Sequence, residues 1–197
     1  MSKMLEKMGV VDLVQQGEMM EIVEEPDPRL HKPSAPIDKF GPEDQQLMAN
    51  MLKFLVTNQG LGLAAVQVGV MKQILVVDAA ACCAYEDAKE YMHPEPYLCM
   101  ANAEVLELSQ EKCSHEEYCF SYPGLGVEIS RSKWGRFRYI DQNGEIQEIK
   151  AYGMLARCIL HEMDHTHGKV IADYLSPVRK QMALKKFAKR SKNMQAK

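Results

Sequence analysis

The clearest helical pattern in the chain lies over residues 152–167, where apolar residues recur at steps of three and four positions. These residues are Tyr152, Leu155, Ile159 and Met163. The spacing places all four side chains on one face of an amphipathic helix, and Gly168 is a typical C-terminal stop. We therefore predict a helix here with one face in the core.

A second helix is predicted between Pro42 and Gly60. Proline suits the first turn of a helix, the acidic residues that follow suit the positive end of the helix dipole, and an apolar stripe runs through the segment. Residues 1–19 also show helical spacing, at Met4, Met8 and Val11, and read as an N-terminal helical extension.

Other segments favour strands. The short apolar run 73–78 is rich in Ile and Val, and the pattern of residues 103–108 also predicts a strand. Residues 134–140 and 145–150 flank an Asp-Gln-Asn-Gly sequence, which predicts an antiparallel hairpin. Residues 79–96 read as a connection. Strands and helices without regular alternation favour an α+β fold over a doubly wound α/β fold.

The charge divides the chain further. It has 197 residues, 24 basic and 27 acidic, for a net charge of −3, which excludes a strongly basic nucleic-acid binder and gives no reason to expect specific DNA as a partner. Eight of the basic residues and no acidic residue lie within 177–197, so the remainder carries −11. We expect an N-terminal extension over 1–19, a catalytic domain over 20–176 and a basic C-terminal helix or tail. That tail is either a solvated helix or an arm for an anionic surface such as ribosomal RNA.

The compartment is suggested by two features. The six cysteines are irregularly spaced and form no C-x-x-C, which favours a reducing environment over a disulfide scaffold. No apolar run is long enough for a membrane helix, and acidic residues interrupt the first segment where a signal peptide would be apolar. We expect a cytoplasmic protein with no membrane partner, in the bacterial cytosol or an organelle matrix.

The predicted helix 152–167 carries the chemistry. It contains His161-Glu162-Met163-Asp164-His165, in which a four-residue step places both imidazoles on one face and the glutamate beside them. This is the H-E-x-x-H pattern of metallohydrolases. The structural alternative is a pair of helical histidines that only form hydrogen bonds.

A metal centre needs a third protein ligand. His167 lies two residues beyond the pair and should point away from it, as a surface residue or an outer partner of the site. Upstream, Cys119 offers a thiolate in the sequence Glu117-Tyr-Cys-Phe-Ser121.

Three ordered motifs give the chain a specific resemblance. It resembles the peptide deformylases, whose motifs are G-x-G-x-A-A-x-Q, E-G-C-L-S and H-E-x-D-H. The corresponding segments are Gly60–Gln67, Glu117–Ser121 and His161–His165, and the similarity runs from about Met20 to Ser176. The resemblance implies antiparallel β-sheets around a central metal-binding helix, with a basic C-terminal helix.

The resemblance also implies roles for individual residues. Cys119, His161 and His165 would bind one divalent ion, and Glu162 would be the general base. The Gln67 amide and the Phe120 backbone N–H would stabilise the oxyanion.

For the substrate, the resemblance suggests a peptide that pairs with the backbone near Gly60 and Gly62. Leu61, Met154 and Cys158 would line an apolar pocket for the methionine side chain. The expected substrates are N-formyl-methionyl peptides, and the expected products are formate and a free N-terminus.

The chain departs from the family pattern at four positions. Tyr118 replaces the usual glycine, where a positive φ would strain a tyrosine, and Phe120 replaces leucine. Gly126 stands where a large residue is common, and Leu160 replaces glutamine. None of these changes removes a ligand or the base, so we expect the chemistry to survive; a shifted substrate preference is the alternative that Tyr118 and Gly126 leave open.

The metal and the partners follow from the resemblance. The family favours Fe(II) in vivo, and a thiolate with two imidazoles also accepts Zn, Ni or Co. A basic C-terminal helix of this kind can dock on the ribosome. The two other interpretations are a deformylase-like hydrolase with shifted specificity and a non-catalytic binder of blocked N-termini.

Overall fold

The computed structural model describes residues 9–84 and 94–195, and the side chains among these up to residue 189. Met4 and Met8 of the predicted N-terminal helix lie outside the described residues. The α-helices are α1 (Val10–Gln16), α2 (Pro42–Thr57), α3 (Ala79–Ala84), α4 (Gly153–Thr166) and α5 (Pro177–Gln195). Short 3-10 turns are η1 (Pro28–His31), η2 (Ala65–Val68) and η4 (Ile171–Tyr174).

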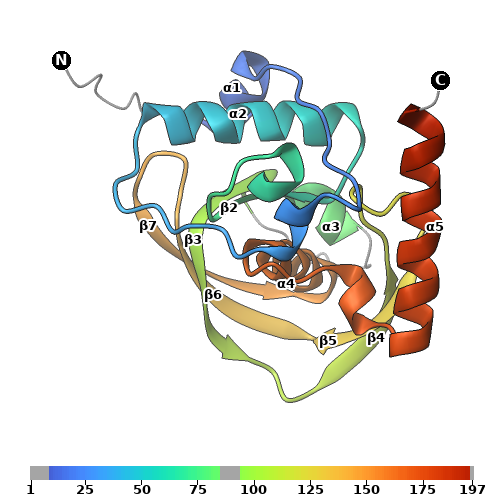
Figure 1. Ribbon diagram of the computed structural model, residues 1–197. Coiled ribbons are helices and arrows are strands. Elements are labelled where there is room, and N and C mark those ends of the chain that lie inside the picture. The colour runs from blue at the N-terminus through green and yellow to red at the C-terminus, as the bar shows by residue number, and fades with distance from the viewer. Residues whose placement is uncertain (1–8, 85–93, 196–197) are drawn as a thin grey trace.

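The strands form two antiparallel sheets (Figure 1). Their bounds are β1 (Gly62–Ala64), β2 (Ile74–Asp78), β3 (Tyr97–Leu108), β4 (Lys112–Glu117), β5 (Val127–Ser132), β6 (Trp134–Ile140) and β7 (Ile146–Tyr152). The larger sheet has the order β1-β2-β3-β6-β7, and β4 pairs with β5 in the smaller one. This architecture confirms the expected α+β class with antiparallel sheets around a central helix.

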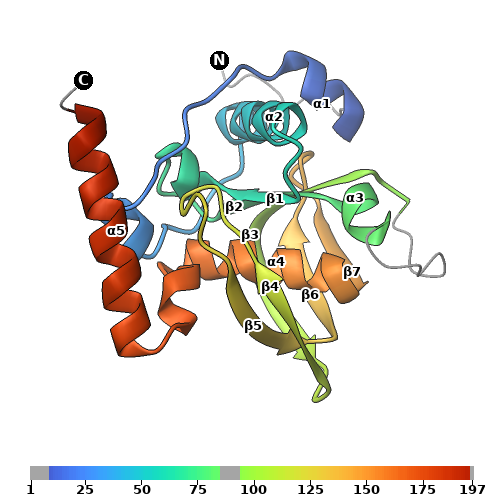
Figure 2. The same ribbon diagram turned by 90° about the vertical axis from the view of Figure 1, so that its right-hand side faces the viewer.

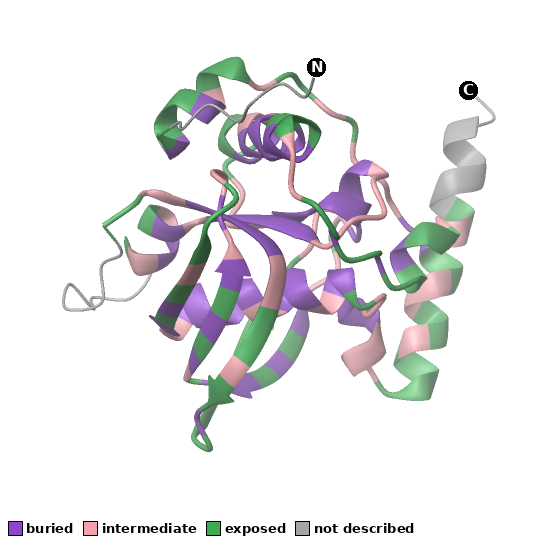
Figure 3. Cartoon of the chain, turned by 90° about the vertical axis from the view of Figure 1, so that its left-hand side faces the viewer, coloured by how far each residue is buried: buried purple, intermediate pink, exposed green. Residues whose placement is uncertain are grey.

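Strand β2 separates two cores, with α2 on one side and α4 on the other (Figure 2). Ile74 and Val76 pack in the cluster with α2, whereas Leu75 and Val77 pack in the cluster with α4. This is the two-residue alternation of an extended strand with both faces buried. Helix α4 is therefore enclosed, as the burial colours show in Figure 3.

The two ends of the chain pack differently on this body. Helix α1 lies against α2 and buries Val10 and Leu13 in the same core. Helix α5 buries Phe187, whose ring meets Tyr122 edge to face at a centroid distance of 5.3 Å. No helix in the described part of the chain combines the length and apolar character needed to cross a bilayer.

Most predicted elements are found, with shifted ends. The strand expected at 103–108 begins at Tyr97, and the connection expected at 79–96 begins with helix α3. Helix α2 ends at Thr57, before Gly60, and the residue with positive φ after it is Gln59. Gly60 has another reason to be glycine, because a Cβ there would lie 2.5 Å from the Phe120 ring.

Candidate active site

A cavity of about 370 Å³ opens between the β1 segment, the end of β4 and helix α4. Nearly all site residues predicted from the sequence line it: Gly60, Leu61, Gly62, Gln67, Cys119, Phe120, Met154, Cys158, His161 and Glu162. His165 lies behind this wall and is 1% exposed. The structure thus brings together residues from three distant segments.

Three candidate metal ligands converge at the base of this cavity. His161 and His165 stand one turn apart on α4 with ring centroids 5.2 Å apart, and Cys119 follows the end of β4. The ligand atoms of the three residues all lie within 4.8 Å of one another, and Cys119 Sγ is 3.2 Å from His165 Nε2. A soft thiolate with two imidazoles suits Zn²⁺ or Fe²⁺, and three protein ligands leave a position open for a reactant.

The surroundings of these ligands also fit a metal ion. His161 Nδ1 lies 2.8 Å from Glu117 Oε2, which leaves Nε2 as the nitrogen for a ligand bond. Burial and the charge of His161 lower the pKa of His165 well below its ordinary value, which favours the neutral ring that binds metal. Burial lowers the pKa of His161, but hydrogen bonds to Cys119 and Glu117 outweigh it and raise the pKa above its ordinary value. A metal ion that binds the ring would therefore displace a proton from it.

Glu117 is the centre of a buried charge network. Its Oε1 accepts hydrogen bonds from Arg131 Nε at 2.7 Å and from Arg157 Nη1 at 2.6 Å. Burial raises the pKa of Glu117, but hydrogen bonds from His161 and Arg131 outweigh it and lower the value to about 2. Glu117 therefore stays ionised and orients His161.

Glu162 has the environment of a general base. The residue is 4% exposed, and its Oε2 is buried without a hydrogen-bond partner among the described residues. Burial raises the pKa of Glu162 to about 7, near the value at which a carboxyl can both accept and return a proton. Gly62 makes room for it, because a Cβ there would lie 2.5 Å from Glu162 Oε1.

Gln67 points its amide at the metal site. Its Oε1 accepts a hydrogen bond from Ala64 N–H at 2.8 Å, which fixes which end of the amide faces the cavity. Its Nε2 then donates towards Cys119 Sγ and Ser121 Oγ, each at 3.3 Å. A donor held in this way is ready for an oxyanion.

The remaining predicted residues fall into two groups. Leu61, Met154 and Cys158 form an apolar part of the cavity wall, as expected for a side-chain pocket. His167 lies outside the cavity, exposed, with Nδ1 2.7 Å from the Met163 carbonyl oxygen, as expected for a surface residue.

The strain expected at Tyr118 does not occur. Tyr118 is absent from the described non-glycine residues with positive φ, and its side chain is 64% exposed at the edge of the cavity. The expectation was wrong because the chain here has an ordinary negative φ and needs no glycine.

Sequence reasoning gave no role to Arg131 and Arg157, which hold Glu117. Arg157 precedes His161 by one helical turn, so it lies on the same buried face of α4. The four-residue step from Arg157 to His161, which places the two side chains on one face of the helix, is the signal that could have found it.

A buried Cys-His₂ cluster with a neighbouring carboxyl, at the base of an open cavity in an α+β fold, defines a metallohydrolase-type site. Residues 19–181 match the family model for polypeptide deformylase. A peptide deformylase of Rickettsia akari is 40% identical over 176 residues, covering 89% of this chain and 98% of the relative. The chain belongs to the peptide deformylase family, whose members are metal-dependent hydrolases that remove the N-formyl group from nascent polypeptides.

Solved structures agree with this family. A peptide deformylase of Ehrlichia chaffeensis in complex with actinonin has a TM-score of 0.79 and 38% identity, covering 88% of this chain and 98% of that one. A class I type b peptide deformylase of Acinetobacter baumannii bound to Met-Ala-Ser has a TM-score of 0.70 and 26% identity, with coverages of 81% and 99%.

Proposed function

We propose that this chain removes the N-formyl group of formyl-methionyl polypeptides at this cavity, with Cys119, His161 and His165 holding one divalent ion. The observation that carries the proposal is the position of Glu162. It is a buried carboxyl with an unpartnered oxygen and a pKa near 7, next to three converging ligand atoms. A purely structural glutamate would have satisfied both oxygens.

The residues of the chain divide the reaction between them. A bound divalent ion supplies Lewis acidity, which brings the pKa of water towards neutrality and polarises a carbonyl. Glu162 accepts a proton as water adds to the formyl carbon, and it returns the proton to the amine nitrogen as the C–N bond breaks. Gln67 Nε2 and the Phe120 backbone N–H donate to the oxygen that gains negative charge. Formate and a free N-terminus are released.

The cavity supports a methionine at the reacting end of the substrate. Leu61, Met154 and Cys158 offer an apolar, polarisable surface beside Glu162. The segment from Gly60 to Gly62 offers backbone groups for strand pairing with the peptide. The related Acinetobacter baumannii enzyme was crystallised with Met-Ala-Ser, which is the product expected from a formylated version of that peptide.

We propose Fe(II) as the ion used in the cell, with Zn, Ni or Co as substitutes. The donor set of one thiolate and two imidazoles accepts all four, so availability selects among them. The six cysteines of the described chain are all free thiols, which suits the reducing bacterial cytosol that we propose as its location.

We also propose that the basic face of α5 brings the enzyme to the ribosome. Lys185, Lys186 and Lys189 are exposed along this helix. We accordingly propose three parts for the chain: an N-terminal extension over 1–19, a catalytic domain over 20–176 and this basic helix over 177–197. Such a surface would bind RNA phosphates without sequence preference.

The direct test is formate release from formyl-Met-Ala-Ser by anaerobically purified, iron-loaded protein. We expect turnover that disappears with a chelator and returns with Fe(II). Binding of the formylated peptide without release of formate would instead support the non-catalytic binder.

A further inference from the structure

The rim of the cavity carries an aromatic and acidic pair that the reaction itself does not use. Tyr118 lies between Glu117 and the ligand Cys119, and its hydroxyl donates a hydrogen bond of 2.7 Å to Glu116 Oε2. Both Tyr118 and Glu116 line the cavity and are exposed to solvent. The hydroxyl thus holds a carboxylate at the edge of the site.

Gly126 allows this pair to form. It lies beside the pair at the start of β5, and a Cβ at this position would lie 2.5 Å from Glu116 Oε1 and 3.0 Å from Tyr118 Cε1. Any larger residue at Gly126 would push the carboxylate or the ring away. Tyr118 and Gly126, which both depart from the family pattern, therefore depend on each other: the tyrosine and the carboxylate fit at the mouth of the site because residue 126 has no side chain.

The charge of Glu116 differs from that of its neighbour. Glu117 is buried and matched by Arg131 and Arg157, so its charge is compensated inside the protein. Glu116 accepts from an uncharged tyrosine, and no ion pair joins it to a cation in the described part of the chain. Its negative charge faces whatever enters the cavity.

We propose that Tyr118 and Glu116 are specificity-determining residues that favour peptides with Lys or Arg in the first positions after formyl-methionine. An aromatic face beside a fixed carboxylate is the chemistry that attracts ammonium and guanidinium groups. The proposal rests on the deformylase activity proposed above and extends it to the residues that follow the methionine.

The experiment compares charged peptides at matched positions. Formyl-Met-Lys-Ser and formyl-Met-Ala-Lys are measured against formyl-Met-Glu-Ser and formyl-Met-Ala-Glu, each relative to formyl-Met-Ala-Ser at low salt. We expect kcat/KM to favour the lysine peptide at one or both positions by about three- to tenfold, mainly through KM, because the pair is exposed to solvent. The preference should shrink as salt is raised.

Three variants identify the source of the preference. Glu116→Gln should abolish the lysine-to-glutamate ratio, and Tyr118→Phe should reduce it by releasing the carboxylate. Glu43→Gln is the matched control, because Glu43 is an exposed carboxylate in the first turn of α2 and does not line the cavity. It should leave the ratio and the turnover of formyl-Met-Ala-Ser unchanged.

The possible failures are distinguishable. The rim proposal would be overturned, with deformylation left intact, by an unchanged ratio in Glu116→Gln, by an equal loss in Glu43→Gln, or by the absence of a lysine preference in the parent. Failure of the parent protein to hydrolyse any formyl peptide would overturn the proposed function, and the rim proposal with it.

Discussion

Helices α4 and α5 are consecutive helices of the chain, yet they treat charged residues in opposite ways. On α4, Arg157, His161 and Glu162 are buried, with residue exposures of 4–8%. Helix α5 lies along one side of the body (Figure 1). Its Lys185 and Lys186 are exposed, and it is held by the buried Phe187 and by an ion pair between Lys180 and Asp173.

The difference teaches where polar residues carry information. Burying an ionisable group costs several kcal/mol unless partners compensate, so charges persist inside a helix bundle or sheet only where something requires them. On α4 that requirement is a site. Solvated lysines cost little folding free energy, so the lysines of α5 indicate only that the electrostatic potential near this helix is positive. Changes on α4 should therefore affect chemistry, and changes on the exposed face of α5 should not.

The largest expected effect comes from Glu162. Replacing it with alanine should lower kcat by about 10²–10⁴-fold, because the reaction loses its proton carrier. Metal content should stay near that of the parent, since Glu162 is not among the three converging ligands. Steady-state kinetics on formyl-Met-Ala-Ser and elemental analysis of the same sample check both points. Near-normal turnover of Glu162→Ala would contradict the proposal that Glu162 is the general base.

The next effect concerns the ligand contributed from outside α4. Cys119→Ala should reduce metal affinity by more than the roughly 10–100-fold typical of a lost outer partner, because one of three protein ligands disappears. Competition with a chromogenic chelator measures the affinity.

His167→Ala is the matched control for this experiment. The His167 ring is exposed and bonds the backbone of its own helix, so metal affinity should be unchanged. Equal metal retention in Cys119→Ala and the parent would contradict the ligand assignment.

A smaller effect is expected at Glu117, the acceptor that holds His161. Glu117→Gln keeps the shape but leaves Arg131 and Arg157 without their shared anion, so we expect a loss of about 3–5 kcal/mol of stability. Metal affinity should fall about 10–100-fold. Thermal unfolding and chelator competition measure the two quantities. Glu148→Gln breaks the solvent-exposed ion pair with Arg138 and should leave the temperature of unfolding nearly unchanged, because water and salt screen exposed pairs.

The features of this structure that the sequence predicts are those that depend on residues close together along the chain. Helix α4 and the pairing of β6 with β7 follow from local periodicity and turn chemistry, so both were predictable. His161 and His165 share a face because of helical geometry alone. That Cys119 belongs with them was inferred through the family resemblance, and in the structure its sulfur lies within 4.8 Å of a ring nitrogen of each histidine.

What the sequence did not give depends on tertiary contacts. Strand β4 is exposed at most of its positions, and the buried positions of β5 include Arg131 and Ser132, so neither strand keeps an alternation of apolar and polar residues over its whole length. The role of Glu117 needs two arginines from β5 and α4, which only folding brings together. Gly60 and Gly62 looked like points of substrate approach, and the structure adds that Phe120 and Glu162 occupy the space of their missing side chains.

The smallest effect on catalysis is expected on α5. Lys185→Glu with Lys186→Glu should leave deformylation of short peptides unchanged, because both side chains are exposed and the site lies on other elements. Binding to ribosomes should weaken, and the slope of log affinity against log salt should fall by about two if each lysine meets a phosphate. Substitution is better than deletion of residues 179–197, which would also remove Phe187 from its contact with Tyr122.

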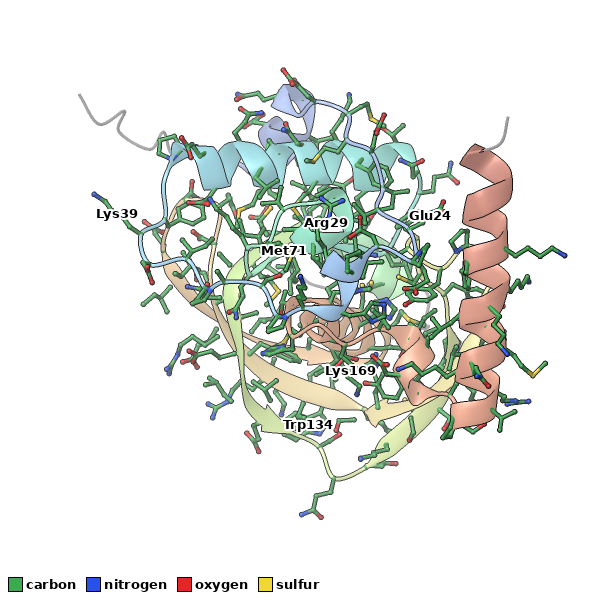
Figure 4. All side chains as sticks on the ribbon, in the orientation of Figure 1. Glu24, Arg29, Lys39, Met71, Trp134 and Lys169 are labelled. Carbon is green, nitrogen blue, oxygen red and sulfur yellow. The ribbon has the colours of Figure 1, made fainter. Side chains whose placement is uncertain are left out.

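A control with the same change of charge separates the helix from the whole-molecule field. Lys39 and Lys112 are exposed on other parts of the molecule, and Figure 4 shows Lys39 projecting on the side away from α5. Lys39→Glu with Lys112→Glu gives the same net charge as the α5 variant. If cosedimentation with ribosomes falls equally in both variants, binding follows net charge and α5 has no special role. If it falls only in the α5 variant, the exposed cations of this helix form the docking face. The charges of α5 would then serve ribosome binding, and the buried charges of α4 would serve catalysis.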